Sequence, residues 1–286
     1  MILKQKTIQK DVCLCGIGVH SGSLTEILLK PAEENAGIIF TSSNFPKDKL
    51  IIGSIVPEET MHATVVKNGK FCISTIEHLM ATVSSLGIDN LIVEVDGPEI
   101  PIFDGSALPF VQAILNVGIK EQSSKKFFIT PKKILKFEDK EGRSIEILPH
   151  IEGDPIKLLF NYGVDFDHPL AGKGILKGEL KKDFFINEIA PARTFGFLSQ
   201  LSKLRQYKLA QGSSLGNTVV IGEDDFINEK RFEDEFVRHK FLDLIGDLAC
   251  LGKNLVGTIN ARKTGHRFNR LVVEHFIKNP DSWKSL

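Results

Sequence analysis

The chain has 286 residues, which fits one large domain or two smaller ones. Its 42% hydrophobic and 25% charged residues are ordinary for a globular protein. The formal net charge is zero, so there is no general electrostatic basis for binding nucleic acid, and any anionic ligand must be held by local basic residues.

The four cysteines show no paired spacing, and Cys72 and Cys250 lie in apolar stretches typical of core thiols. We therefore expect no disulfide framework and a reducing, cytoplasmic location. The N-terminus has no apolar signal-peptide core, and no run approaches the roughly 18 apolar residues that a membrane-spanning helix needs. We expect a soluble protein with no spanning segment.

The first half of the chain alternates strand-like runs with two helical segments. Strands are predicted at residues 24–29, 37–40 and 90–95. Apolar residues at helical spacing predict a helix over residues 74–86, which Gly87 ends. A second helix is predicted from a cap at Ser106 to about Asn116.

The polar segment 120–126 is interpreted as a domain boundary. After it, strands are predicted at residues 132–137, 144–148, 156–162 and 255–261, and helices at 181–189, 231–251 and 265–277. Both halves thus end in helix, strand, helix, which indicates a structural duplication. We predict an α+β fold of two similar domains, residues 1–121 and 126–286. Each would layer a sheet with two helices, and the helix layers would pack together around a site.

Glu77 and His78 follow Ser74 at the start of the first predicted helix. In the simplest interpretation, Ser74 and Glu77 form a capping box and His78 is a surface histidine. The pair does not match the HExxH motif of zinc peptidases. Taken alone, it is weak support for a catalytic site.

A polar stripe on the predicted helix 231–251 is more informative. His239, Asp243 and Asp247 are spaced four apart and share one helix face. A solvated face is the simplest interpretation, but apolar residues flank the stripe: Phe232, Phe236, Gly246 and Cys250. Unpaired buried charges are costly, and a metal ion removes that cost. The stripe therefore indicates a metal site.

Together with His78, this stripe supplies a His-His-Asp ligand set. The four-residue spacing lets His239 and Asp243 reach one ion, and His78 completes three protein ligands. Three protein ligands leave a fourth position for water, the arrangement typical of catalytic zinc, which lowers the pKa of that water. Glu77, next to a ligand, could take the proton of the attacking water.

His266 follows Gly265 at the start of the last predicted helix. An exposed histidine at a capped helix end is the simplest interpretation. In the functional interpretation, a protonated His266 stabilises an oxyanion and protonates the leaving amine. Asp247 would keep His266 charged, since a nearby anion raises the pKa of a histidine.

All of these residues except His266 lie within ordered motifs that resemble the UDP-3-O-acyl-N-acetylglucosamine deacetylase family, the zinc amidases of bacterial lipid A synthesis. The motifs are GIGVHSG (16–22), STIEHLMA (74–81), GIDN (87–90), GPEIPIFDGSALPF (97–110), ARTFGF (192–197) and RFEDEFVRHKFLDLIGDL (231–248). The resemblance covers nearly the whole chain. It implies a metal-dependent hydrolase of two α+β domains with the active site between them.

The resemblance also implies roles for individual residues. Zinc would bind His78, His239 and Asp243, with Glu77 as general base and His266 as general acid oriented by Asp247. Further roles fall to Thr194 at the oxyanion, Lys240 at the anionic part of the substrate, Phe195 and Met61 beside the acyl passage, Asp165 and Phe166 at the nucleotide, and Arg143 near the diphosphate. We expect one zinc per chain, with ferrous iron tolerated, an acylated UDP-sugar substrate, no nucleic acid, and a monomer.

Residues 195–222 would form the hydrophobic insert that holds the acyl chain, although an ordinary helix and loop would show the same pattern. Apolar residues suited to an acyl passage are Phe197, Leu198, Leu201 and Leu204. The chain departs from the family at Arg270, which replaces a neutral amide, at Phe268, a conservative apolar change, and at Ala63, where cysteine or threonine is common.

Three other interpretations are open. The chain could be a zinc amidase acting on another N-acetylated substrate. It could be a nucleotide-sugar binding protein that takes up no zinc. Capping boxes and core packing could also account for the motifs without any site. In that case His239→Ala and Asp243→Ala would change stability without changing metal content.

Overall fold

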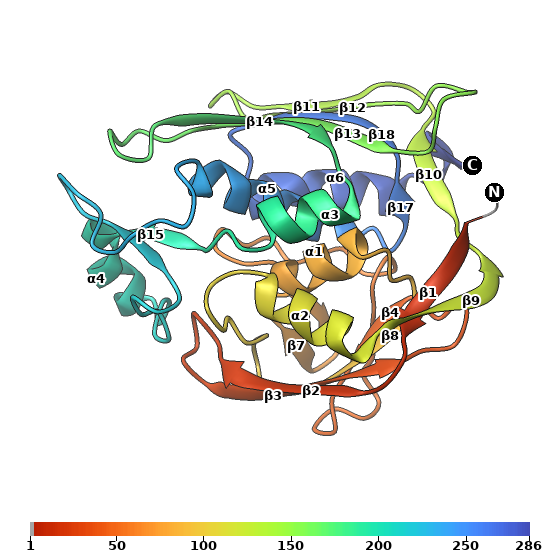
Figure 1. Cartoon of the computed structure of the whole chain (residues 1–286), viewed down its shortest axis with the longest axis horizontal. Helices are drawn as coiled ribbons and strands as arrows, with labels where there is room; N and C mark the ends of the chain where they lie inside the picture. The colour runs from red at the N-terminus through yellow and green to blue at the C-terminus, as the bar shows by residue number, and fades with distance from the viewer. Residues whose placement is uncertain (1–2) are drawn as a thin grey trace.

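The computed structural model describes residues 3–286 and has four layers, in the order sheet, helices, helices, sheet (Figure 1). The predicted α+β class and the packing of helix layer on helix layer are confirmed. Helix α1 (Glu77–Ser85) and helix α5 (Glu235–Ala249) meet at the centre. The two predicted metal-binding fragments are therefore brought face to face.

The first sheet has the strand order β2-β3-β8-β4-β5 and is antiparallel except between β4 and β8. Its strands are β2 (Val12–Ile17), β3 (Leu24–Pro31), β4 (Ile38–Thr41), β5 (Leu50–Ile51) and β8 (Leu91–Asp96). In β8, Leu91, Val93 and Val95 are buried and alternate with more exposed residues, because side chains point to opposite faces of a sheet. The buried face lies under α1 and α2 (Leu108–Val117).

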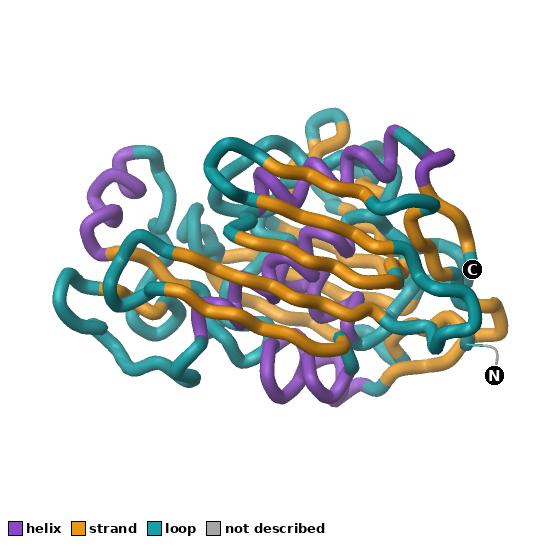
Figure 2. The backbone as a smooth tube through the Cα atoms, turned by 90° about the horizontal axis from the view of Figure 1, so that it is seen from above, coloured by secondary structure: helices purple, strands orange, loops and turns teal. Residues whose placement is uncertain are grey.

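The second sheet has the order β11-β12-β18-β13-β14, and Figure 2 shows its strands side by side from above. Its strands are β11 (Leu135–Glu138), β12 (Ser144–Leu148), β13 (Leu158–Asp165), β14 (Lys173–Glu179) and β18 (Gly257–Arg262). Helices α5 and α6 (His266–Lys278) lie beneath this sheet (Figure 1). Sheet and helices are thus repeated in the two halves, with the two sheets on the outside.

Further short elements complete the fold. They are β1 (Lys4–Ile8), β6 (Val66–Asn68), β7 (Phe71–Ile73), β9 (Ile119–Lys125), β10 (Phe128–Pro131), β15 (Phe195–Phe197), β16 (Val219–Ile221), β17 (Asn254–Leu255), β19 (Trp283–Ser285), α3 (Lys182–Phe184) with the π-helical turn Phe185–Ile189, α4 (Leu198–Gln206) and the 3-10 turn Pro280–Ser282. Segment 120–126, interpreted from the sequence as a boundary, lies mostly in β9, which pairs with β1. The strand was not predicted because its residues are polar. Backbone hydrogen bonds to β1, and not the burial of an apolar face, hold β9 in place.

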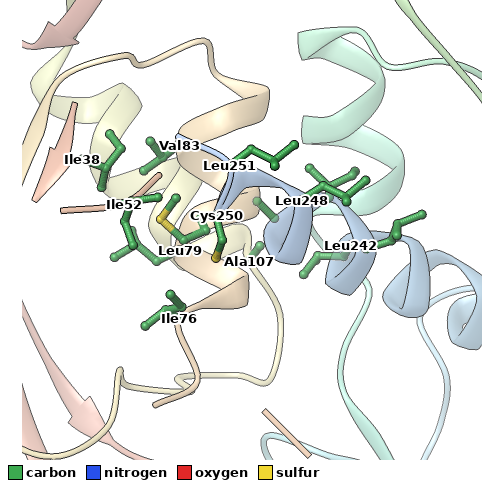
Figure 3. Close-up of a cluster of buried hydrophobic side chains, with 14 of the residues drawn as sticks. Ile38, Ile52, Ile76, Leu79, Val83, Ala107, Leu242, Leu248, Cys250 and Leu251 are labelled. Atoms are coloured by element: carbon green, nitrogen blue, oxygen red, sulfur yellow. The ribbon is translucent and has the colours of Figure 1, made fainter. Parts of the chain in front are cut away.

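The core is centred on the contact between α1 and α5. Figure 3 shows Leu79 of α1 beside Cys250, which follows α5, with Leu248 further along α5. Gly246 allows the two helices to approach closely, since a Cβ at this position would lie 2.1 Å from the Glu77 carbonyl oxygen. Close packing of α1 on α5 is therefore possible only with a glycine here.

Two local predictions need correction. The helix predicted over residues 74–86 begins only at Glu77, because Thr75 has a φ of 59°, which is not helical. Ser74 instead pairs with Glu99 as a strand bridge. Cys72 was predicted as a core thiol and is exposed, since strand alternation in β7 turns it outward, whereas Cys250 is buried as expected. Among the described residues, no helix is long and apolar enough to cross a membrane.

Candidate metal centre and active-site cavity

The start of α1 does not form a capping box. The Ser74 hydroxyl donates to the Pro98 carbonyl, and the Glu77 carboxylate accepts the Thr64 backbone N–H at 2.9 Å. No side chain caps this helix. The simplest interpretation of Glu77 is therefore wrong, and its carboxylate is buried next to His78.

His78, His239 and Asp243 form a buried cluster between α1 and α5. Each offers one ligand atom, and these three atoms lie within 4.8 Å of one another. Asp243 Oδ1 lies 3.5 Å from His239 Nε2 and 3.9 Å from His78 Nε2. Each of the three side chains is 4% exposed or less. Two imidazoles and one carboxylate at this separation fit a divalent metal ion.

The hydrogen bonds of the cluster favour metal binding. His239 Nδ1 donates to the Ala192 carbonyl at 3.0 Å, which assigns the proton to Nδ1 and leaves the Nε2 lone pair facing Asp243. The second Asp243 oxygen accepts from Lys240 Nζ at 2.7 Å. Such outer contacts orient metal ligands in proteins.

Burial and nearby charges give the three proposed ligands the protonation states that bind a metal. Burial lowers the pKa of His78 to about 3 and also lowers the pKa of His239, so both imidazoles are neutral. Burial opposes the charge on Asp243, but the positive charges of Lys240 and His266 outweigh it and hold the pKa of this carboxyl below its usual range. Neutral imidazoles and an ionised carboxylate are the forms that bind metals.

A second buried pair, His266 and Asp247, lies beside the cluster. His266 Nδ1 is 2.9 Å from Asp247 Oδ2, and His266 Nε2 is 3.9 Å from Asp243 Oδ2. Burial opposes the charge on His266, but the carboxylates of Asp247 and Asp243 raise its pKa to about 9. His266 is therefore a buried imidazolium, and not the exposed helix-end histidine of the simplest interpretation.

The environment of Glu77 favours its neutral form, whereas that of His266 favours its charged form. Burial raises the pKa of this carboxyl to about 7, although the charge of His266 acts against the shift. A carboxyl with a pKa near neutrality can accept and release a proton at physiological pH. Glu77 thus has the properties of a general base.

Thr64 connects both acid–base groups and was missed in the sequence. Its N–H donates to Glu77, and its hydroxyl donates to Asp247. Asp247 also accepts from Asn269 Nδ2 at 2.7 Å. Thr64 lies in an irregular segment before β6, where no periodicity or motif singles out one residue.

The cluster lies in a cavity of about 510 Å³. One wall is apolar and includes Phe197 of β15 with Leu198, Leu201 and Leu204 of α4. In Figure 1, α4 and β15 extend to one side of the four layers. Four residues predicted to bind substrate line the same cavity: Met61, Phe166, Phe195 and Lys240. Thr194, predicted to act at the oxyanion, lines it too.

Two predicted substrate residues do not line this cavity. Asp165 bonds to Lys263 at 2.9 Å, next in the chain to the cavity residue Phe166. Arg143 bonds to Asp139 at 2.6 Å and to Glu141 at 3.0 Å, and it lines a separate pocket beside α6. Their predicted contacts with a nucleotide are not evident in this geometry.

His20 and His62 also line the cavity and were not predicted as site residues. His20 Nε2 lies 3.2 Å from the His62 carbonyl oxygen, and their rings are 6.3 Å apart. His20 belongs to the GIGVHSG motif, so a histidine within a glycine-rich turn was an available signal. His62 had no comparable signal.

Arg270 and Ala63, two residues that differ from those usual in the family, both lie near Thr64 in the structure. Arg270 Nε donates to the Pro57 carbonyl at 2.6 Å, and its Nη1 bonds to Glu274 at 2.9 Å. Its charge is therefore paired, and it fastens the segment before Thr64 to α6. Ala63 is buried.

A buried His-His-Asp cluster with an adjacent carboxylate and imidazolium defines, in an α+β fold, the class of metal-dependent hydrolases. Residues 5–278 match the family model described as UDP-3-O-acyl N-acetylglycosamine deacetylase. The chain belongs to this family, and the resemblance noted in its motifs is confirmed.

Curated relatives extend this match over the whole chain. The chain is 39% identical over 289 residues to the UDP-3-O-acyl-N-acetylglucosamine deacetylase of Colwellia psychrerythraea, covering 99% of this chain and 93% of the relative. It is 39% identical over 287 residues to the protein of that name from Syntrophotalea carbinolica, covering 99% and 91%. It is 37% identical to that of Ruthia magnifica over 286 residues, covering 99% and 92%.

Proposed function

We propose that this chain hydrolyses the acetamide of UDP-3-O-acyl-N-acetylglucosamine and releases acetate, as the committed step of lipid A synthesis. The observation that carries the proposal is the buried His78, His239 and Asp243 cluster in a cavity with an apolar wall. The family match supports the same reaction. A cytoplasmic, monomeric enzyme remains our prediction.

We infer that the metal is zinc, one ion per chain, held by His78, His239 and Asp243. When bound, the metal would polarise the acetamide carbonyl and lower the pKa of a water molecule. Zinc suits two imidazoles and a carboxylate, and ferrous iron is the alternative. Residues 1–121 and 126–286 are proposed as the two domains that contribute ligands.

The chain's own residues would supply the remaining chemistry. Glu77 would take a proton from the attacking water, and the Thr194 hydroxyl would donate to the oxyanion. His266, held by Asp247, would stabilise the same charge and then protonate the departing nitrogen. Lys240, at the cavity wall, would contact the anionic part of the substrate.

Substrate contacts follow from the shape of the cavity. Its apolar wall supports an acyl chain, which would pass Phe195 and Met61. Phe166 would contact the nucleotide together with Asp165. To contact the diphosphate as proposed, Arg143 would have to break its ion pair with Asp139 when substrate binds.

The proposal is tested by metal analysis and acetate release on the same preparations. Wild type should contain one zinc per chain and release acetate, whereas His78→Ala should lose both. His150→Ala is the control, because His150 lies outside the cavity. Wild type that binds the UDP-sugar but takes up no metal would contradict the proposal.

A second assay separates this substrate from other N-acetylated compounds. Acetate release should require the 3-O-acyl chain, so the unacylated UDP-sugar should be hydrolysed much more slowly. Equal rates on both substrates would favour an amidase of another specificity. Reconstitution of metal-free protein with zinc or with ferrous iron, one at a time, would identify the active ion.

A further inference from the structure

A buried ion pair outside the proposed chemistry joins Arg193 to Glu235. Glu235 is fully buried and Arg193 is 8% exposed. One Glu235 oxygen accepts the Arg193 backbone N–H at 2.9 Å and its Nε at 3.0 Å. The other accepts the Arg231 backbone N–H at 2.6 Å and Arg193 Nη2 at 3.3 Å.

Both oxygens of Glu235 accept hydrogen bonds, which offsets part of the high cost of burying its charge. Well-packed apolar residues usually stabilise a protein as much as a buried ion pair does. An ion pair retained at such a position can instead select one geometry among several close alternatives. The question is therefore which geometry the Arg193–Glu235 pair selects.

The geometry concerns the segment 192–194, which joins α3 to β15 alongside α5 (Figure 1). Glu235 and His239 are four residues apart, so they lie on the same face of α5 in successive turns. Glu235 binds the N–H of Arg193, and His239 donates to the carbonyl of Ala192. Neighbouring residues of the segment are thus fastened to neighbouring turns of the helix.

The same segment carries Thr194 into the cavity. The Thr194 N–H donates to the Gly105 carbonyl at 2.8 Å, and its carbonyl accepts the Val219 N–H at 2.9 Å. A shift of the segment along α5 would move the Ala192 carbonyl away from His239 Nδ1 and would displace Thr194. His239 and Thr194 are both proposed to act at the metal centre.

We propose that Arg193 and Glu235 form a positioning pair for the metal site. The pair holds segment 192–194 in register with α5, so that the Ala192 carbonyl orients His239 toward the ion and Thr194 faces the substrate. This inference rests on the proposed function, because it assigns a role to groups around the proposed metal.

Glu235→Gln is the most direct test. The glutamine keeps the size of the side chain, but its NH₂ group faces N–H donors and cannot accept from them. The loosened segment should take the Ala192 carbonyl, the outer-shell partner of His239, out of place, so we expect metal affinity to fall roughly 10–100-fold. kcat at saturating metal should also fall, with KM little changed, because Thr194 is proposed to act on the oxyanion.

Two further variants make the result interpretable. Both Arg193→Lys and Arg193→Gln keep the backbone N–H bond to Glu235, but only lysine keeps the positive charge beside this carboxylate, so Arg193→Lys should lose less metal affinity than Arg193→Gln. Asp234→Asn is the matched control, because Asp234 precedes Glu235 and its carboxylate pairs with Arg238 rather than with Arg193. The control should keep wild-type metal affinity.

Metal affinity is measured by chelator competition and kcat and KM by acetate release, with folding checked by thermal unfolding. A Glu235→Gln protein with a lower Tm but unchanged metal affinity and kcat would overturn the positioning role, and so would equal losses in Asp234→Asn. Failure of the proposed function is distinguished by the wild type itself. If wild type binds no metal, the proposed function is overturned and this inference with it.

Discussion

Among individual side chains, His266 has a charge that depends on its carboxylate neighbours. Asp247 and Asp243 raise its pKa to about 9 against the effect of burial, from an ordinary value of 6.5. A raised pKa means that the folded state holds the proton more tightly than the unfolded chain does. This contribution to stability is fully present below pH 6.5 and is lost as the pH rises through about 9.

The first prediction follows from this linkage. Asp247→Asn removes the anion that bonds to His266, so its pKa should fall. In metal-free protein, the free energy of unfolding should then decrease less between pH 6.5 and 9 than it does in wild type. Urea unfolding across this pH range measures the difference. Parallel curves for variant and wild type would contradict the prediction.

Arg270 leads to a second prediction for a single side chain. Arg270→Asn restores a neutral amide but loses the bond to the Pro57 carbonyl. We expect the free energy of unfolding to fall by about 1.5–3 kcal/mol, the range for hydrogen bonds to charged groups. Faster proteolysis at residues 57–63 should accompany it.

Lys278→Gln is the matched control for Arg270→Asn. It removes the exposed bond between Lys278 and Glu274, while Arg270 keeps its own contacts. Its effect on the free energy of unfolding should stay within about 0.5 kcal/mol. If both variants behave alike, the bond to Pro57 does not hold the segment in place.

Between helices α1 and α5, close packing depends on Gly246. A Cβ there would lie 2.1 Å from the Glu77 carbonyl oxygen, and neither backbone can move without shifting its helix. Each helix carries at least one proposed ligand: His78 on α1, and His239 with Asp243 on α5. Spacing between the helices therefore controls the spacing of the metal site.

The third prediction concerns Gly246→Ala. Overpacking at this contact should destabilise the protein by about 1–3 kcal/mol and should also weaken metal binding. Gly163→Ala is the control, because its Cβ would meet neighbours no closer than 3.8 Å. Denaturant unfolding and chelator competition measure the two effects. A Gly246→Ala protein with wild-type stability would show that the helices can separate freely.

For the chain as a whole, the metal would join the two halves. His78 belongs to the first half and His239 and Asp243 to the second, so an ion bound by all three can only be held when both halves are folded and packed. Binding to the folded state alone stabilises it by mass action. Metal should therefore stabilise both halves together.

The fourth prediction puts a magnitude on this coupling. At a free zinc concentration 100 times its dissociation constant, the free energy of unfolding should rise by about 2.7 kcal/mol over the metal-free protein. His78→Ala should show no such gain. The measurement is denaturant unfolding followed by probes in each half. Stabilisation seen in only one half would contradict a shared site.

Local patterns in the chain were sufficient for the fold class and for most of the candidate site. Helical periodicity located α1, α5 and α6, and the four-residue spacing put His239, Asp243 and Asp247 on one face. These features depend on residues close in sequence, where the geometry of a single helix sets which side chains share a face.

Contacts between distant segments were settled only by the tertiary structure. The roles of Thr64 and of the Ala192 carbonyl, the outward orientation of Cys72, the pairing of β9 with β1 and the remote place of Arg143 have no local signature. Each depends on which strand, loop or helix packs against it. Backbone groups and single polar side chains carry no periodicity, so their partners become apparent only when the chain is folded.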